Sequence, residues 1–457
     1  MSGPAGHRMT PVQRAWCVYD WANSVFKISV LTVFLSLYLT EVATADARAA
    51  GQPCESALRE CAVTVFGVSV QAGSVFGFLL AGSTVLQVLV LPITGAIADR
   101  VRDKRGLLAG FALAGAAATC GLVVVNGTSW RLGAALFALA NLCYYASVVV
   151  YYAFLPEIAT PDQRDGVSAK AWAFGYLGGG LCLAANIALV QARGLFGLSE
   201  GDAIRVCFVV CGIWWAVFTL LPLRRLPGAA EPALAATDAA GGLLSAGFRQ
   251  LGGTLAQARR YPVTLAFLAG FLIYIDGVNT VGATAGLYGS QELHLPVEVL
   301  TITILVVQFV AFGGGLAHGW LAGRIGAKRT LLVSLALWSV VITAAYFVQA
   351  GQRLQFFGVA LGIGLVIAGP AALSRSLFSQ LVPKGRAAEY FALYTLGERG
   401  TSSLGPLVFA LVANATGSFR PAILSLIGFL VVGFVVVAMV PLRRGIRAVG
   451  NPEPTLI

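Results

Sequence analysis

Long runs without any acidic or basic side chain constrain this sequence more than any other feature. A bilayer core about 30 Å thick needs about 20 apolar residues in a helix, and ten charge-free runs meet that length. Only 11% of the residues are charged, against about a quarter in a soluble domain, so lipid must surround most of the protein. The runs are 61–98, 106–130, 132–156, 171–192, 206–223, 299–323, 330–352, 354–374, 400–419 and 421–442.

Two further apolar stretches contain charge inside them. Asp20 and Lys27 lie in residues 14–42, and Asp276 lies in residues 261–290. Counting these stretches, the sequence predicts an all-α integral membrane protein with about twelve transmembrane helices.

The largest interruption, rich in Pro, Ala and Gly, separates six spans from six. It predicts an N-terminal six-helix half at 1–224, a cytoplasmic linker at 225–260 and a C-terminal six-helix half at 261–457. Within the linker, apolar residues recur at roughly helical spacing, which fits either an interfacial helix or a flexible connection. These residues are Leu243, Leu244, Phe248, Leu251 and Leu255.

The distribution of Lys and Arg predicts the topology. Basic residues gather on the side of both termini and the linker, which the positive-inside rule places in the cytoplasm. Their short clusters do not resemble a nucleic-acid site, despite a net charge of +11. Frequent Arg, Ala and Gly are typical of a bacterial protein, so we expect the inner (cell) membrane. The polar loop with Cys54 and Cys61 then lies outside, where a disulfide between them is possible.

The two halves repeat short patterns at nearly equal offsets. The segment 95–105 after the second span is echoed by 319–329 after the eighth, 224 residues later. Pro161 and Arg164 are likewise echoed 222 residues later, by Pro383 and Arg386. Such offsets indicate a duplication, as in transporters built from two parallel six-helix repeats.

The first of these segments resembles the loop signature of the major facilitator superfamily. Asp99, Arg100 and Arg105 match the signature, whereas Arg102 replaces a family glycine. An Asp at the end of the second span can accept hydrogen bonds from a neighbouring helix N-terminus. We therefore expect loop or gating roles for these matching residues, and for Arg324 in the second copy.

Four segments resemble the vacuole-effluxer family of this superfamily, whose fungal members export amino acids from the vacuole. They are residues 19–24, 154–158, 274–280 and 404–406, the last preceded by Arg399. The resemblance implies a secondary transporter that exports amino acids or related zwitterions. Lys27 and Glu398 depart from the pattern that we would expect for the family.

Charged residues inside the spans are the candidate substrate contacts, because burying a charge in lipid costs roughly 2.5–3.5 kcal/mol. Asp20, Asn23 and Lys27 share one helix face. Lys27 could bind a carboxylate of the substrate, or could pair with an acid on another helix. For Asp20, nearer the cytoplasmic end, we favour a structural or gating role.

Asp276 is the acidic candidate in the second half. It lies near the middle of the seventh span, with the polar residues Asn279 and Thr280 close by. Asp276 could bind a substrate ammonium or titrate as a proton-coupling site. The alternative is a permanent ion pair with Lys27 or Arg399.

Arginine and tryptophan supply the remaining candidates. Arg399 could clamp a carboxylate through two hydrogen bonds, and Arg375 is a second basic candidate. For both, pairing with Glu389 or Glu398 is the alternative. We expect Trp16, with Trp21, Trp130 and Trp172, to anchor helices at the membrane interface.

No motif for catalysis, ATP hydrolysis or metal binding is present, so we expect neither an enzyme nor a cofactor. The expected partners are a small solute, the lipid bilayer and, if Asp276 titrates, protons. We expect a monomer that transports by alternating access. Two other functions stay open: an exporter of larger amphiphiles such as siderophores, drugs or lipids, and a receptor or assembly factor on a transporter fold.

Overall fold

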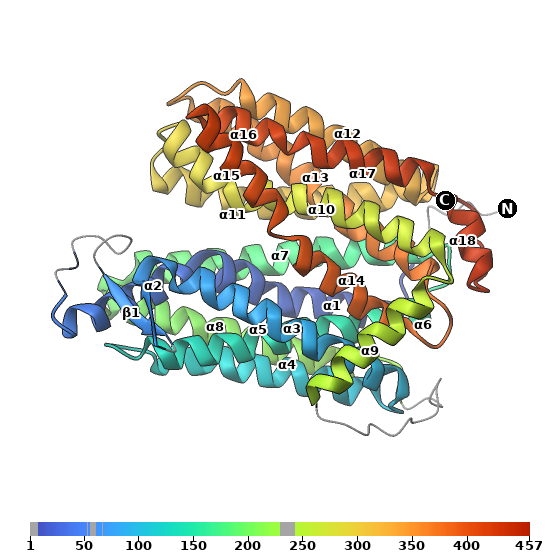
Figure 1. Cartoon of the computed structure of the whole chain (residues 1–457), viewed down its shortest axis with the longest axis horizontal. Coiled ribbons are helices and arrows are strands. Elements are labelled where there is room, and N and C mark those ends of the chain that lie inside the picture. The colour runs from blue at the N-terminus through green and yellow to red at the C-terminus, as the bar shows by residue number, and fades with distance from the viewer. Residues whose placement is uncertain (1–7, 53, 55–60, 66, 229–242) are drawn as a thin grey trace.

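A computed structural model describes residues 8–52, 54, 61–65, 67–228 and 243–457. The chain forms two bundles of helices that lie side by side, and Figure 1 shows the N-terminal bundle below the C-terminal one. Within the described residues, strands occur only as the hairpin of β1 (Ala62–Val65) and β2 (Val68–Gln71), in which Ala62 pairs with Gln71.

The N-terminal bundle contains a first span that changes helix type near its middle. There α1 passes into the π-helix η2, which passes into α2. The elements are α1 (Pro11–Val25), η2 (Phe26–Phe34), α2 (Leu35–Ala49), η3 (Ala72–Ser74), α3 (Val75–Arg100), α4 (Lys104–Gly121), η4 (Leu122–Val124), α5 (Trp130–Ala153), α6 (Leu155–Ile158), α7 (Arg164–Gln191), η5 (Arg193–Phe196) and α8 (Glu200–Leu223).

The linker helix α9 (Leu243–Ala258) lies beside α3 and precedes the second bundle. The predicted linker residues 229–242 lie outside the described part of the chain. The second bundle comprises α10 (Pro262–Leu287), η6 (Tyr288–Glu292), α11 (Val297–Ile325), α12 (Ala327–Tyr346), α13 (Arg353–Gln380), α14 (Ala387–Thr401), α15 (Leu404–Thr416), α16 (Phe419–Ser425), α17 (Ile427–Met439) and α18 (Leu442–Ala448).

Eleven helices in the described part of the chain are long and apolar enough to cross a membrane. The one predicted span that does not form a single long helix is 400–419, which is divided between α14 and α15 at Ser402–Ser403. Pro406 explains the break, because its ring clashes with the carbonyl four residues earlier and it has no N–H to donate. The predicted all-α membrane fold is confirmed, with one span interrupted.

The two ends of the molecule differ. The hairpin β1–β2 lies at one end, which we call the hairpin end, whereas α9, α18 and the C-terminus lie at the opposite, linker end (Figure 1). Cys54 and Cys61 form a disulfide bond beside the hairpin. The basic loops of the sequence signature lie at the linker end, after α3 and α11.

Small residues allow the two bundles to approach each other closely along α7 and α11. A Cβ atom on Gly315 would lie 3.0 Å from the Cβ of Ala173, and one on Gly319 would lie 2.8 Å from that of Ala169. This packing resembles the small-residue contacts by which helices associate in membranes. Elsewhere between the halves, α3 and α5 contact α14, and α7 contacts α13.

Candidate functional site

The C-terminal end of α3 is fastened to the beginning of α14. Asp99 accepts hydrogen bonds from the backbone N–H groups of Ala388 and Glu389, at 3.0 and 2.9 Å. These are orphan donors of the first turn of α14, where a negative charge is favourable. Arg100 adds an ion pair with Glu389 at 3.2 Å. The capping contact expected for Asp99 therefore joins the two halves.

A second inter-half contact buries an arginine completely. The guanidinium of Arg375, on α13, donates to Asp20 Oδ2 at 3.0 Å and to the side chain and carbonyl oxygens of Ser168, each at 2.9 Å. Its Cζ atom also lies 4.7 Å from the ring centre of Trp16 and 4.9 Å from that of Tyr152. Arg375 thus pairs with Asp20 rather than with Glu389 or Glu398.

Further polar contacts join α7 to α13 nearby. Arg164 donates to the carbonyl of Ser379 at 3.0 Å, Ser376 donates to Asp165, and Gln380 donates to the carbonyl of Pro161 at 2.9 Å. Across the described ranges, every hydrogen bond and ion pair between the two halves lies toward the linker end. The structure is therefore closed at the linker end.

Unpaired charges from both halves meet deeper in the bundle. The ammonium group of Lys27, in η2, has no hydrogen bond or ion pair among the described residues, and its Nζ lies 5.7 Å from the ring centre of Trp172. Glu398 and Arg399 of α14 lie near enough to act electrostatically on the Lys27 ammonium. Arg399 lies over the ring of Tyr145 at 4.3 Å, and its Nε and Nη2 atoms have no acceptor there.

This arrangement bears on the alternatives that the sequence left open. Ion pairs of Lys27 or Arg399 with an acidic residue are absent from the described part of the chain, so neither charge is locked by a partner. The π-helical η2 is unusual, because π-helix is rare and occurs mostly as single-turn bulges, frequently at functional sites, whereas η2 has nine residues. We call Lys27, Glu398, Arg399, Tyr145 and Trp172 the central cluster.

Asp276 lies apart from that cluster, at the break between α14 and α15. Its Oδ2 accepts from the N–H of Gly405 at 2.7 Å, and its Oδ1 has no donor within the described residues. Thr280 donates to the Asp276 carbonyl at 2.7 Å. The alternative of a permanent ion pair with Lys27 or Arg399 is wrong for this structure, because the amide at the start of α15 holds the carboxylate instead.

The surroundings of Asp276 repeat those of Asp20 in the other half. Ser24 donates to the Asp20 carbonyl at 2.6 Å, as Thr280 does to that of Asp276. A Cβ on Gly175 of α7 would lie 2.7 Å from Ser24 Oγ, and a Cβ on Gly405 of α15 would lie 2.1 Å from Thr280 Oγ1. The first and seventh spans therefore occupy equivalent positions, as the sequence repeats indicate.

The other predicted site residues are placed as follows. Asn23 is buried beside Asp20 with no acceptor for its amide nitrogen, and Asn279 is half-buried on α10. Arg105, at the start of α4, pairs with Asp103, which caps that helix, and Arg324 Cζ lies 4.0 Å from the ring centre of Trp320. Slight burial raises the pKa of Asp103, but hydrogen bonds from Arg105 and its charge outweigh that effect, and the pKa is lowered overall.

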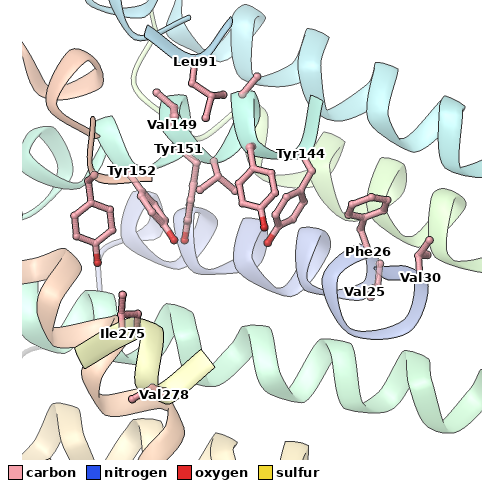
Figure 2. Packing of buried hydrophobic residues seen from close by; sticks show 14 of the residues in the cluster. Val25, Phe26, Val30, Leu91, Tyr144, Val149, Tyr151, Tyr152, Ile275 and Val278 are labelled. Carbon is pink, nitrogen blue, oxygen red and sulfur yellow. The ribbon is translucent and has the colours of Figure 1, made fainter. Parts of the chain in front are cut away.

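Sequence reasoning missed how the aromatic residues are used. The prediction that Trp16 anchors at the membrane interface is wrong, because Trp16 is fully buried and stacks on Tyr151 at 4.4 Å. Trp130 is also buried, where it donates to Asp46. A signal was present in α5, where two adjacent tyrosine pairs are seven residues apart and so share a helix face. Figure 2 shows Tyr144, Tyr151 and Tyr152 pointing from α5 toward α1.

The Asp99 contact gives a first prediction. Replacing Asp99 by alanine leaves two backbone donors of α14 without an acceptor, at about 1–3 kcal/mol for a buried group, so the linker end should open more often. Distances between spin labels at the linker ends of α3 and α14 should lengthen. Asp103→Ala is the control, since Asp103 is exposed and its hydrogen bonds go to Arg105 at the start of α4, within the same half. Equal distances in both variants would rule out a gating role for Asp99.

The fold and the contacts between its halves define a membrane transporter with the major facilitator architecture. A proton:xylose symporter, XylE, superposes with a TM-score of 0.70 at 11% identity, and covers 94% of this chain and 95% of its own. The human organic anion transporter MFSD10 superposes with a TM-score of 0.65 at 17% identity, with 93% and 98% covered. At these identities the likeness shows the fold alone.

Within that class, residues 10–450 match the model of the family described as "Vacuole effluxer Atg22 like". The chain is 30% identical to an uncharacterized MFS-type transporter, YxiO, of Bacillus subtilis, over 95% of this chain and 96% of the relative. It is 26% identical to autophagy-related protein 22 of Eremothecium gossypii, over 94% and 90%. The chain therefore belongs to the vacuole effluxer family, whose members are transporters rather than enzymes.

Proposed function

We propose that this transporter exports amino acids or related zwitterions by alternating access, with the central cluster as its substrate site. The observation that carries the proposal is the meeting of opposite charges from both halves. Lys27 and Arg399 offer donors without acidic partners in the described residues, and Glu398 lies beside them. A zwitterion needs this combination, with the basic pair for its carboxylate and Glu398 for its ammonium.

A site formed by both halves suits alternating access. Lys27 belongs to the first span and Arg399 to the interrupted eleventh, so a bound solute would contact both bundles at once. Rocking of the bundles would then expose the solute first at one end and afterwards at the other. The linker end, already closed here, is the side where that movement must break Asp20–Arg375 and the Asp99 contacts.

Orientation and direction belong to the same proposal. The basic loops gather at the linker end, so we place that end in the cytoplasm of a bacterial cell and the disulfide-bonded hairpin outside. The family description names efflux, which supports movement of solute from the linker end to the hairpin end. We further propose that the protein acts as a monomer, because one chain supplies both halves of the site.

Proton coupling is proposed at Asp276. One of its oxygens has a single donor and the other has none in the described part of the chain, so a proton could bind there as the α14–α15 break moves. Asp276→Asn can still accept from Gly405 through its amide oxygen but cannot titrate. We expect the variant to retain solute flux while losing the response of that flux to a pH gradient.

The experiment is flux in liposomes reconstituted with the full chain and a panel of labelled amino acids, with and without a pH gradient. Saturable, substrate-selective flux in the wild type supports the transport proposal. Equal leak for every solute would defeat it. Selective flux that ignores the pH gradient in both wild type and Asp276→Asn would remove the proton-coupling part alone.

A further inference from the structure

Every group that holds the Arg375 guanidinium belongs to the opposite half of the protein. Arg375 is fully buried, and its charge is met by one carboxylate, one hydroxyl, one carbonyl and four aromatic rings. Besides Trp16 and Tyr152, the rings of Tyr151 and Trp172 contact this guanidinium, with their centres 5.6 and 5.7 Å from Cζ. We call this set the aromatic box: Trp16, Asp20, Tyr151, Tyr152, Ser168 and Trp172.

All six residues of the box belong to the N-terminal half, although Tyr152 also packs against Tyr394 and Ser168 also donates to the carbonyl of Ala372. Trp16 and Asp20 are one turn apart on α1, and Ser168 and Trp172 are one turn apart on α7. The indole of Trp16 donates to the carbonyl of Tyr151 at 2.9 Å. In Figure 2, Tyr151 and Tyr152 reach from α5 toward α1. If the halves part at the linker end, Arg375 leaves with α13, while the residues of the box remain with the N-terminal half.

A vacated box retains the chemistry of a cation-binding site. Aromatic faces attract cations, most strongly when water is excluded, and a carboxylate fixes guanidinium or ammonium donors. We propose that the aromatic box is a second substrate subsite, which binds the cationic group of the solute from the linker side and for which Arg375 is a built-in competitor. This inference rests on the proposed transport function and identifies the chemical group of the substrate that the subsite binds.

Competition with Arg375 would couple substrate binding to the opening and closing of the linker end. A cation in the box prevents α13 from closing against α7, because it occupies the space between the aromatic rings that the Arg375 guanidinium needs. When Arg375 returns, it displaces the cargo toward the hairpin end, along Trp172. That ring lies 5.7 Å from both Arg375 Cζ and Lys27 Nζ, so the box and the central cluster are contiguous. The displaced carboxylate and ammonium then meet Lys27, Arg399 and Glu398.

Ethylguanidinium tests the competition directly, because it copies the end of the arginine side chain. Spin labels introduced through unnatural amino acids at Arg102 and Arg329, both exposed at the linker end, would report the separation of the halves in lipid nanodiscs. In the otherwise unchanged protein we expect ethylguanidinium to populate longer distances saturably. Ethylurea, which has nearly the same shape and no charge, should have no effect.

Matched variants test whether ethylguanidinium acts by binding in the aromatic box. Asp20→Asn should weaken the ethylguanidinium response about 10- to 100-fold, the value of a charge-assisted hydrogen bond. Asp165→Asn removes another buried linker-end carboxyl outside the box and should keep the response. Arg375→Ala should bind ethylguanidinium more tightly than the wild type, because the competitor is gone.

Two results would overturn the inference. One is an unchanged distance distribution in the wild type together with no ethylguanidinium binding to Arg375→Ala. The other is an equal loss of response in Asp20→Asn and Asp165→Asn. Flux of amino acids is measured separately, so selective flux with no ethylguanidinium response rejects the box alone, and a response without any flux rejects the transport proposal alone.

Discussion

Replacing Lys27 by glutamine should reduce amino-acid flux about 10- to 100-fold while leaving the protein at least as stable as the wild type. The loss corresponds to one charge-assisted hydrogen bond to the substrate, about 1.5–3 kcal/mol. Stability should not fall, because Lys27 forms no ion pair with an acidic residue in the described part of the chain. The substitution therefore leaves no carboxylate without its partner. Removing a charge from a membrane span is in itself favourable.

Lower flux together with unchanged stability distinguishes a residue that binds substrate from one that only packs the helices. Flux of labelled amino acids into proteoliposomes gives the first quantity, and the temperature of thermal unfolding in detergent gives the second. Lys384→Gln is the matched control, since it removes the same charge from an exposed loop at the linker end and should change neither. A lower unfolding temperature with proportionally lower flux would assign Lys27 to the architecture and remove it from the proposed site.

Replacing Arg375 by methionine should produce the largest loss of stability among single substitutions at the charged sites. Breaking a buried ion pair by removing one partner costs about 3–5 kcal/mol, because the other charge stays buried without compensation. Here the stranded group is Asp20, 11% exposed at its side chain and surrounded by aromatic rings. The linker-end distance should lengthen as well, since Arg375 fastens α13 to both α1 and α7.

A double-mutant cycle measures the interaction energy between Asp20 and Arg375. Asp20→Asn added to Arg375→Met neutralises the stranded carboxylate, so the double variant should be more stable than Arg375→Met alone. Arg353→Met, at an exposed position near the hairpin end, controls for loss of an arginine. The ion pair would be judged unimportant if Arg375→Met cost no more than Arg353→Met, or if the two single costs simply added.

Several features of the fold follow from local patterns. The charge-free runs located the membrane helices, and the repeated segments predicted two equivalent halves, which the Asp20 and Asp276 surroundings reproduce. The Asp99 signature predicted an acceptor for a helix N-terminus, and α14 provides it. The break at Ser402–Ser403 was not predicted, although Pro406 lies beside it. A hydropathy count treats proline like any other residue of an apolar run, although proline has no backbone N–H to donate to a helix.

The sequence by itself determined that lipid surrounds the chain, that two repeats form it and that few charges lie within the spans. Only the tertiary structure decided what those charges do. Asp20 meets Arg375 across 355 positions, Asp276 meets a backbone amide 129 positions away, and Lys27 meets no acid in the described residues. The reason is physical: hydropathy is a property of neighbouring residues, whereas a partner for a buried charge is chosen by which helices pack together.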